Sequence, residues 1–243
     1  KRVGSIDLDA RQGTLTRYLS NRFSFVSRTQ KNLPSPDHMA IEKSKLDNDD
    51  QRRFEESSFL DLALHELKQI CDYIVIDTPG SDTYLNRQSH QKADILITPM
   101  NDSFIDLDVL AHVDSDDYAK TQPSFYSEMV MDLQSRRRRE DRPEIDWIVM
   151  RNRLAHLDMN NKREIGDILS VLAEKYGFRM CHGFGERVIF RELFLKGLTL
   201  MDLQEDKDIK MTMSELAARQ EVRSLIQTID PDVIAESQRA EQE

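Results

Sequence analysis

Tyr73-Ile74-Val75-Ile76-Asp77-Thr78-Pro79-Gly80 is the stretch of sequence that decides the fold class. Its four hydrophobic residues are β-branched or aromatic, which favours a buried strand of a parallel sheet, and the strand ends abruptly at an acidic residue and a turn. The opening stretch Val3 to Asp9 repeats this pattern, with Asp7 and Asp9 at its end. Open α/β sheets bind ligands at the carboxyl ends of their strands. Two acidic strand ends therefore predict a site for a magnesium-bound nucleotide.

Length and composition indicate a soluble protein with a charged exterior. Its 243 residues are enough for one α/β domain, and we expect a single domain over residues 1–243. The formal net charge of −10 argues against a protein coated in nucleic acid and leaves a local basic face open. There is no apolar run near the roughly 18 residues that cross a bilayer, and no signal-peptide pattern, so we expect a cytosolic protein. Cys71 and Cys181 lack the spacing of a metal or disulfide site.

Hydrophobic periodicity predicts alternating strands and helices. Strands are expected at residues 3–9, 73–77, 93–98, 145–150 and 178–181, and helices at 11–25, 59–70, 104–113, 162–176 and 214–229, with a further helix that ends at the arginines 136–139. Thr14 is the expected N-cap of the first helix, and Gly177 is the expected C-cap of the helix over residues 162–176. Residues 27–50 predict a long surface loop, and residues 230–243 a polar acidic tail. The order predicts an α/β fold with a doubly wound, mostly parallel sheet.

Five segments, in the same order, resemble the MipZ family of the ParA/MinD group, whose members are deviant Walker A P-loop ATPases. They are Asp7-Leu8-Asp9 with Arg11-Gln12, Asp77 to Gly80, Thr98 to Phe104, Arg151 to Ala155, and Phe190 to Phe194. The Asp-Thr-Pro-Gly turn alone is common among P-loop proteins. The ordered set is far more specific, and it spans nearly the whole chain.

The resemblance implies an ATPase that regulates where a cell divides. Such a protein uses ATP and Mg, forms a homodimer with ATP, binds DNA non-specifically, interacts with ParB and inhibits the polymerisation of FtsZ. The implied location is the cytoplasm, on the nucleoid, with enrichment near the cell poles, and no membrane partner is expected. Two alternatives stay open: a ParA-type partition ATPase that acts on a chromosome or plasmid, and a non-enzymatic interaction module that has lost its P-loop.

The resemblance also assigns roles to residues at the two acidic strand ends. Asp9 matches the catalytic acid that positions the attacking water, and Asp77 the carboxylate that holds Mg through water. Asp7 is a further candidate metal ligand. The nucleotide-binding turn after Asp77 comprises Thr78, Pro79 and Gly80.

Asn152 matches the residue that reads the adenine edge, with Arg153 alongside. The chemistry agrees, since an amide side chain can donate to one adenine nitrogen and accept from the adenine amino group. The glycine-rich loop of the family does not occur in these 243 residues. It is expected on a strand and helix ahead of Lys1, about 30 to 40 residues upstream. We therefore expect an N-terminally truncated chain, and an ATPase activity that belongs to the full-length protein.

Basic residues suggest where DNA would bind. The run Arg136 to Arg139 stands beside Glu140 and Asp141 and is typical of a solvated helix end rather than a DNA contact. The expected DNA contacts are dispersed arginines that neutralise phosphates, namely Arg163, Arg179, Arg187 and Arg191. Arg191 has the alternative of pairing with a core carboxylate. The last helix is expected to pack on the sheet, because an anionic membrane would repel the acidic tail that follows it.

Overall fold

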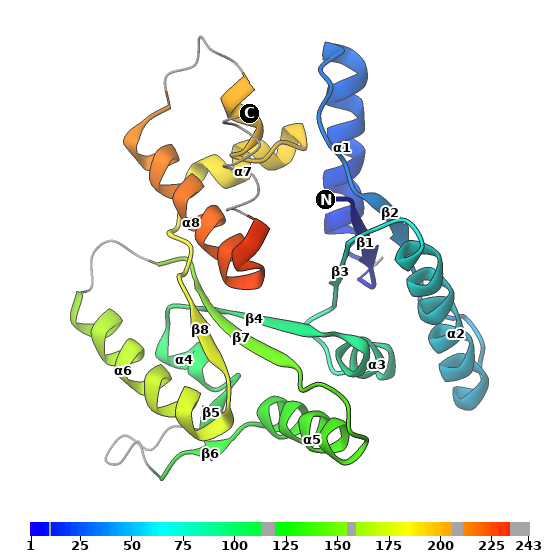
Figure 1. The fold of residues 1–243 in the computed structure, drawn as a ribbon, viewed down its shortest axis with the longest axis vertical. Coiled ribbons are helices and arrows are strands. Elements are labelled where there is room, and N and C mark those ends of the chain that lie inside the picture. The colour runs from blue at the N-terminus through cyan, green and yellow to red at the C-terminus, as the bar shows by residue number, and fades with distance from the viewer. Residues whose placement is uncertain (10, 113–119, 155–158, 206–210, 234–243) are drawn as a thin grey trace. The chain divides into compact units, whose positions relative to one another are not determined.

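The computed structural model describes residues 1–9, 11–112, 120–154, 159–205 and 211–233. The chain forms two compact units (Figure 1). The first unit contains Lys1–Lys92 and Ile189–Asp206, and the second contains Ala93–Val188 and Lys207–Glu243. Both contain parallel strands and helices, which confirms the α/β class. The single domain expected over the whole chain stays a prediction, and each unit is described by itself.

The first unit is built on a three-stranded parallel sheet with the order β2-β1-β3. Its strands are β1 (Val3–Asp7), β2 (Asp37–Ala40) and β3 (Tyr73–Asp77). Ser5 pairs in register with His38, and Asp7 with Asp77. Since parallel strands end at the same edge of a sheet, the two acidic strand ends lie side by side, as the sequence predicts.

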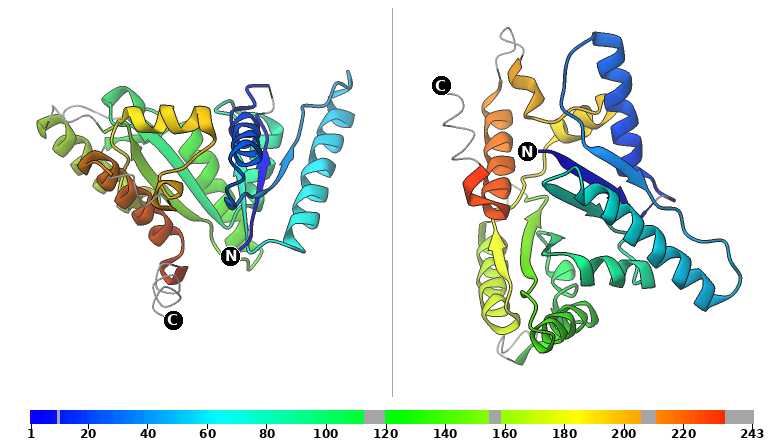
Figure 2. Two further views of the ribbon diagram at one scale, coloured as in Figure 1. Left: turned by 90° about the horizontal axis from the view of Figure 1, so that it is seen from above. Right: turned by 45° about the vertical axis from the view of Figure 1, so that its right-hand side comes forward.

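Helices complete the first unit. They are α1 (Thr14–Thr29), α2 (Asp49–Lys68), α3 (Tyr84–Lys92), most of α7 (Val188–Lys196) and the short 3-10 helix η2 (Asp202–Glu205). Figure 2 shows α2 beside the strands of this sheet. Its buried residues Leu60, Ala63 and Leu67 form a core with Ile6 and Leu8 of the β1 segment.

The prediction of a surface loop over residues 27–50 is wrong for parts of that range. Helix α1 continues to Thr29, β2 pairs with β1, and Leu33 and Ile41 are buried. Strand β2 has only four residues, two polar followed by two apolar, so it carries no hydrophobic alternation. At the end of the 27–50 range, Asp49 and Asp50 form the first turn of α2, and the N-cap Asn48 accepts hydrogen bonds from two backbone amides of that turn. Carboxylates are favourable there because the helix dipole is positive at its N-terminus.

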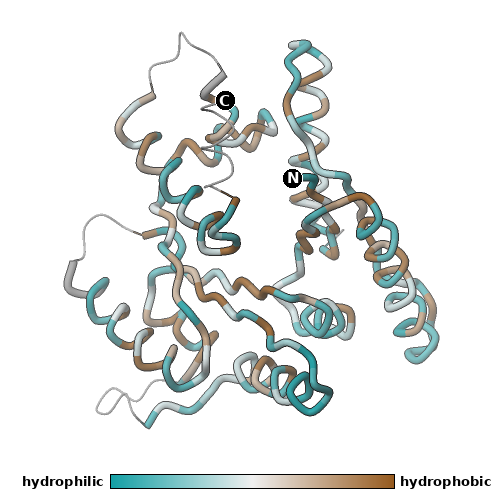
Figure 3. Tube along the Cα trace, viewed as in Figure 1, coloured by the Kyte–Doolittle hydropathy of each residue, from teal (hydrophilic) through white to brown (hydrophobic). Residues whose placement is uncertain are grey.

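The second unit contains a parallel sheet with the order β4-β7-β8 and a small antiparallel pair, β5-β6. The strands are β4 (Ile95–Asn101), β5 (Ala111–His112), β6 (Gln122–Pro123), β7 (Asp146–Asn152) and β8 (Arg179–Cys181). The helices are α4 (Phe104–Leu107), α5 (Phe125–Arg139), α6 (Met159–Tyr176) and α8 (Met213–Ile229). Figure 3 shows hydrophobic residues along β4 and β7. Trp147 of β7 is 1% exposed at the centre of this core.

Several expected boundaries in the second unit need correction, and others are confirmed. Pro99 does not end β4, because β4 lies at the edge of its sheet, where a residue without an N–H is tolerated. The helix expected over 104–113 ends at Leu107 and is followed by β5. Gly177 caps α6 in the left-handed conformation, as predicted. Leu225 and Ile229 of α8 pack against Ile148, which confirms that the last helix covers the sheet.

Candidate functional site

Three carboxylates converge where β1 and β3 end. Asp7 is the last residue of β1, Asp77 the last residue of β3, and Asp9 lies in the loop that leads to α1. The backbone ties these segments together, because Leu8 N donates to Asp77 O at 2.9 Å and the carbonyl of Asp9 accepts from Gln12 N and Gly13 N. The sequence therefore predicts correctly that these residues share one edge of a sheet.

Asp7 and Asp77 have different surroundings. The Asp7 side chain is fully buried, and both of its oxygens accept hydrogen bonds: Oδ1 from Asp9 N, and Oδ2 from the N–H and the hydroxyl of Thr16. Asp77 is half-buried, and among the described residues no donor reaches its carboxylate. Burial raises the pKa of Asp77 above its usual range, and the neighbouring Asp7 and Asp9 carboxylates raise it further.

These surroundings fit a cation at Asp77. A half-buried carboxylate without hydrogen-bond donors, repelled by two neighbours, gains most from a positive ion. The described residues contain no group of three carboxylate, imidazole or thiol side chains that encloses a metal ion. Mg²⁺ is usually held by one or two carboxylates together with water and substrate phosphates, so a protein cage is not needed. Asp7 is less suited to hold the ion, because its side chain is fully buried and both of its oxygens already accept hydrogen bonds.

The turn after Asp77 is held in shape by α3. Asn86 of α3 donates from its side-chain nitrogen to Pro79 O at 2.9 Å and to Ser81 O at 3.0 Å. Pro79 is buried, whereas Gly80 is exposed and has open space around it. Thr78 is half-buried. The turn that carries the predicted nucleotide contacts is therefore anchored at its base and open at Gly80.

The predicted adenine contacts lie in the second unit, at the carboxyl end of β7. Asn152 is half-buried, and its Oδ1 accepts from Arg153 N at 2.9 Å. Arg153 is exposed and left-handed, with φ of 52°. One lone pair of Oδ1 and the amide N–H groups of Asn152 remain available, so this side chain can still donate and accept. The adenine role of both residues stays a prediction.

The residue before Asn152 anchors this strand end. Arg151 donates through Nε to Asp102 Oδ1 at 2.8 Å and through its terminal nitrogen to Lys162 O at 3.0 Å. The Asp102 side chain is 4% exposed, so the ion pair is buried. Arg151 and Asp102 belong to two of the five segments that resemble the family. Their contacts connect the ends of β4 and β7 to α6.

The arginines expected at DNA differ in what surrounds them. Arg163 is exposed on α6, and Arg191 is exposed on α7 in the first unit. Arg179 contacts both carboxylate oxygens of Asp146 at 2.7 and 2.6 Å. The Arg187 side chain is 9% exposed and forms a two-pronged ion pair with Glu221 of α8. This pairing gives Arg187 a structural partner. The DNA contacts expected at these four arginines stay predictions.

The basic run at the end of α5 also has a residue with a structural role. Arg137 is buried, whereas a solvated helix end was expected for the whole run. It donates to Ala93 O at 2.6 Å and to Pro143 O at 3.3 Å. The neighbours Arg136, Arg138 and Arg139 are not buried. Arg137 therefore satisfies carbonyl groups near β4 rather than contributing to a basic surface.

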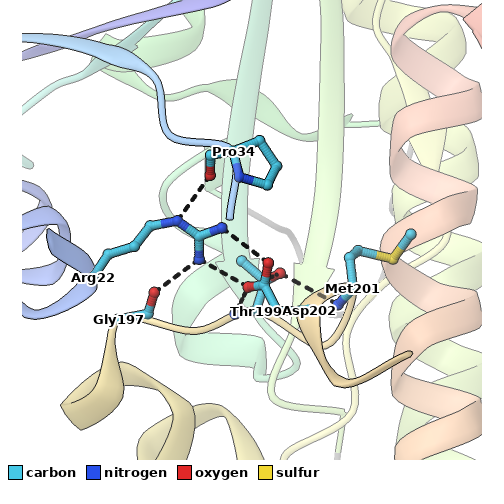
Figure 4. Close-up of polar contacts among 6 residues, drawn as sticks. All are labelled: Arg22, Pro34, Gly197, Thr199, Met201 and Asp202. Atoms are coloured by element: carbon cyan, nitrogen blue, oxygen red, sulfur yellow. Dashed lines mark hydrogen bonds and ion pairs between the residues drawn. The ribbon is translucent and has the colours of Figure 1, made fainter. Parts of the chain in front are cut away.

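A buried ion pair in the first unit had no signal in the sequence. Arg22 of α1 donates to both oxygens of Asp202 at 2.8 and 2.9 Å, and to the carbonyls of Pro34 and Gly197 at 2.9 Å each (Figure 4). Asp202 also accepts from the N–H and hydroxyl of Thr199. Arg22 and Asp202 are 180 residues apart, and neither has a neighbour in sequence that marks it. We call these contacts the Arg22 clasp; they hold the end of α7 against α1.

Comparison with known proteins gives one family and several related folds. The family model described as ATPase MipZ matches residues 1–231. No curated protein sequence matches the chain. The apo structure of McdA from Cyanthece is 15% identical, with a TM-score of 0.56 over 91% of this chain and 87% of that chain. At this identity the likeness to McdA concerns the fold alone.

Two further solved structures match the chain with lower scores. A ParA family ATPase from Chlorobium tepidum TLS is 14% identical, with a TM-score of 0.48 over 91% of this chain and 85% of that chain. The MinD cell division protein of Aquifex aeolicus is also 14% identical, with a TM-score of 0.48 over 93% of this chain and 84% of that chain.

Among the described helices of this chain, none has the length and apolar character of a membrane span.

Proposed function

Because this chain belongs to the MipZ family of ATPases, we propose that it is an ATP-gated dimeric regulator of division-site placement. In this proposal, the ATP-bound homodimer binds DNA non-specifically, interacts with ParB and inhibits FtsZ polymerisation, and ATP hydrolysis ends that state. The protein would accordingly be found on the nucleoid and concentrated near the cell poles.

The observation that carries the proposal is that the carboxylates at the ends of β1 and β3 lie close together but have different surroundings. Asp77, which has no hydrogen-bond donor among the described residues, would hold Mg²⁺ through water. The ion neutralises negative charge on the phosphates when it is bound. Asp9 is half-buried beside Asp77 and would accept a hydrogen bond from the attacking water, which orients that water toward the terminal phosphate.

The remaining site residues complete the proposal. Thr78, Pro79 and Gly80 form the anchored turn next to the phosphates, and Asn152 with Arg153 would contact the adenine. Phosphate binding itself requires a glycine-rich loop, which we place on a segment upstream of Lys1 in the full-length protein. Strand β3 lies at the edge of the three-stranded sheet of the first unit, so within that sheet its outer backbone edge is unpaired, as the addition of a further strand would require.

The test is ATP-dependent dimerisation, followed by size-exclusion chromatography with light scattering, on this chain and on an upstream-extended chain. We expect only the extended chain to dimerise with ATP and to hydrolyse it. Dimerisation that persists together with lost turnover in the Asp9→Ala variant would support the role of Asp9. An extended chain that neither dimerises with ATP nor hydrolyses it would favour a non-enzymatic interaction module. Sequence-specific DNA binding that survives high salt would contradict a contact that rests on phosphates.

A further inference from the structure

A continuous line of hydrogen bonds connects the core of the first unit to the loop that carries Asp9. Ser5 Oγ lies 2.9 Å from His38 Nδ1, and His38 Nε2 lies 3.0 Å from Thr16 Oγ1. Thr16 Oγ1 donates to Asp7 Oδ2 at 2.7 Å, and Asp7 Oδ1 accepts from Asp9 N at 2.9 Å. The line thus joins β2, β1, α1 and the Asp9 loop, and all of its members belong to the first unit.

The direction of these bonds follows from the number of protons that each group has. A carboxylate only accepts, so the single hydroxyl proton of Thr16 points to Asp7. Thr16 Oγ1 must then accept from His38, which places the ring proton of the neutral imidazole on Nε2. His38 Nδ1 is left to accept from the hydroxyl of Ser5, which is 3% exposed. Thr16 Oγ1 and the ring of His38 therefore each donate one and accept one of these bonds, whereas Ser5 donates and Asp7 only accepts.

Asp7 uses this arrangement to replace a missing helix cap. Helix α1 begins after Gly13, which is left-handed with φ of 56° and has no side chain to cap the first turn. Thr14, the N-cap expected from the sequence, is instead the first residue of the helix. The free N–H of Thr16 donates to Asp7 Oδ2 at 3.1 Å, so a carboxylate from β1 caps α1. The same carboxylate holds Asp9 N with its other oxygen.

We propose that Asp7, Thr16 and His38 are positioning residues that determine where the Asp9 carboxylate lies, and that Asp7 is not a magnesium ligand. The loop between β1 and α1 is closed at both ends by one carboxylate, and the hydroxyl of Thr16 and the ring of His38 fix the orientation of that carboxylate. Its two oxygens accept three hydrogen bonds and its side chain has no exposed area. This inference rests on the proposed function, because it assigns Asp9 a role in orienting water.

The test compares Thr16→Val with Thr16→Ser in the full-length protein. Valine keeps the shape and the backbone N–H of Thr16 but removes the hydroxyl, whereas serine keeps the hydroxyl. Thr14→Val is the matched control, because Thr14 is exposed on the same turn of α1. The first readout is hydrogen exchange of the Asp9 amide without nucleotide, and the second is the kcat and KM of ATP hydrolysis.

We expect Thr16→Val to speed exchange of the Asp9 amide about tenfold or more, since its acceptor, the Asp7 carboxylate, then keeps only the Thr16 N–H of the two Thr16 donors that fix its orientation. We also expect kcat to fall with KM unchanged, and Thr16→Ser to restore both values. Asp9 exchange that stays at the wild-type rate in Thr16→Val would overturn the positioning role, whatever the enzyme does. Faster exchange with an unchanged kcat would also overturn it, because Asp9 placement would then not matter for turnover.

Failure of the proposed function gives a different result. If wild-type full-length protein does not hydrolyse ATP at all, the exchange readout still tests whether Asp7, Thr16 and His38 hold Asp9. A further measurement needs no variant: nitrogen chemical shifts of His38 in the unmodified protein distinguish the two ring tautomers. We expect the proton on Nε2, and a proton on Nδ1 of the neutral ring would contradict the direction of the whole line.

Discussion

The Arg22 clasp allows a sharp test of what holds the 189–206 segment in the first unit. We expect Arg22→Met to release this segment from α1. Methionine preserves the unbranched stem of the side chain but removes the guanidinium. The change leaves the carboxylate of Asp202 without its cation and deprives the carbonyls of Pro34 and Gly197 of their donor.

The magnitude follows from burial. The side chains of Arg22 and Asp202 are 5% and 8% exposed, so water cannot replace the lost contacts. Removing one partner of a buried ion pair costs about 3 to 5 kcal/mol. Thr199 still donates twice to Asp202 after the change, so we expect the lower end, about 3 kcal/mol. That value corresponds to roughly a 100-fold faster exchange of amides that open with the segment.

The assay is hydrogen exchange followed by mass spectrometry, with peptides from 189–206 compared with peptides from β1 and β3. Arg28→Met is the matched control, because Arg28 is exposed on the last turn of the same helix; it should change stability by less than about 0.5 kcal/mol. The double variant Arg22→Met with Asp202→Leu removes both charges. It should recover much of the loss, since no buried charge is left alone.

The pH dependence gives a second check. Burial acts to raise the pKa of Asp202, but the hydrogen bonds from Arg22 and Thr199 outweigh it and hold this pKa below its usual range. In the wild type, the clasp therefore stabilises the protein above the unfolded pKa of about 3.9, and this contribution is lost as pH falls through the lower folded value. Arg22→Met lacks the hydrogen bonds from Arg22 and therefore lacks this contribution at neutral pH. The difference between variant and wild type should then shrink in acid.

Two results would refute this reasoning. One is equal protection of 189–206 in Arg22→Met and Arg28→Met at neutral pH. The other is a double variant no more stable than Arg22→Met, because the cost would then not come from an unpaired Asp202.

Three further changes test the carboxylate site and the Arg22 clasp. Asp9→Ala should lower ATP turnover of the full-length protein by at least about 100-fold, while ATP-dependent dimers persist in light scattering; unchanged turnover would exclude the proposed role. Asp77→Asn should weaken Mg-dependent nucleotide binding in calorimetry yet stabilise the nucleotide-free protein by up to about 1 kcal/mol. The raised pKa of Asp77 means that its destabilising effect is present at neutral pH and fades as pH falls through the folded value, so the gain should vanish in acid. Gly197→Ala should cost at least about 2 kcal/mol in urea unfolding, because an added Cβ would lie 2.0 Å from Arg22 N at a φ of 63°; wild-type stability would contradict the clasp geometry.

Sequence reasoning was most successful where local pattern and global structure agree. The apolar runs that end at Asp7 and Asp77 predicted two strands, their parallel pairing and the shared acidic edge. Helices α6 and α8 were also predicted to within three residues of their N-terminal ends, because their apolar faces repeat regularly. In contrast, β2, α3 and α7 were missed. Strand β2 has only four residues, two polar and then two apolar, which gives no strand pattern in the sequence; the strand is recognised by its pairing with β1.

What the sequence by itself determined is the α/β class, the acidic strand ends and the family. Only the tertiary structure decided the role of each charged group. Asp7 and Asp77 have the same side chain at equivalent strand positions. Asp7 accepts hydrogen bonds from Thr16 of α1 and from the Asp9 amide, whereas the pKa of Asp77 is raised by burial and by its acidic neighbours, which suits the cation proposed there. Arg187 and Arg163 differ in the same way, because Glu221 approaches only Arg187. Such partners are distant in sequence, and the charge they satisfy depends on which helix packs beside the strand, which residue type and spacing do not encode.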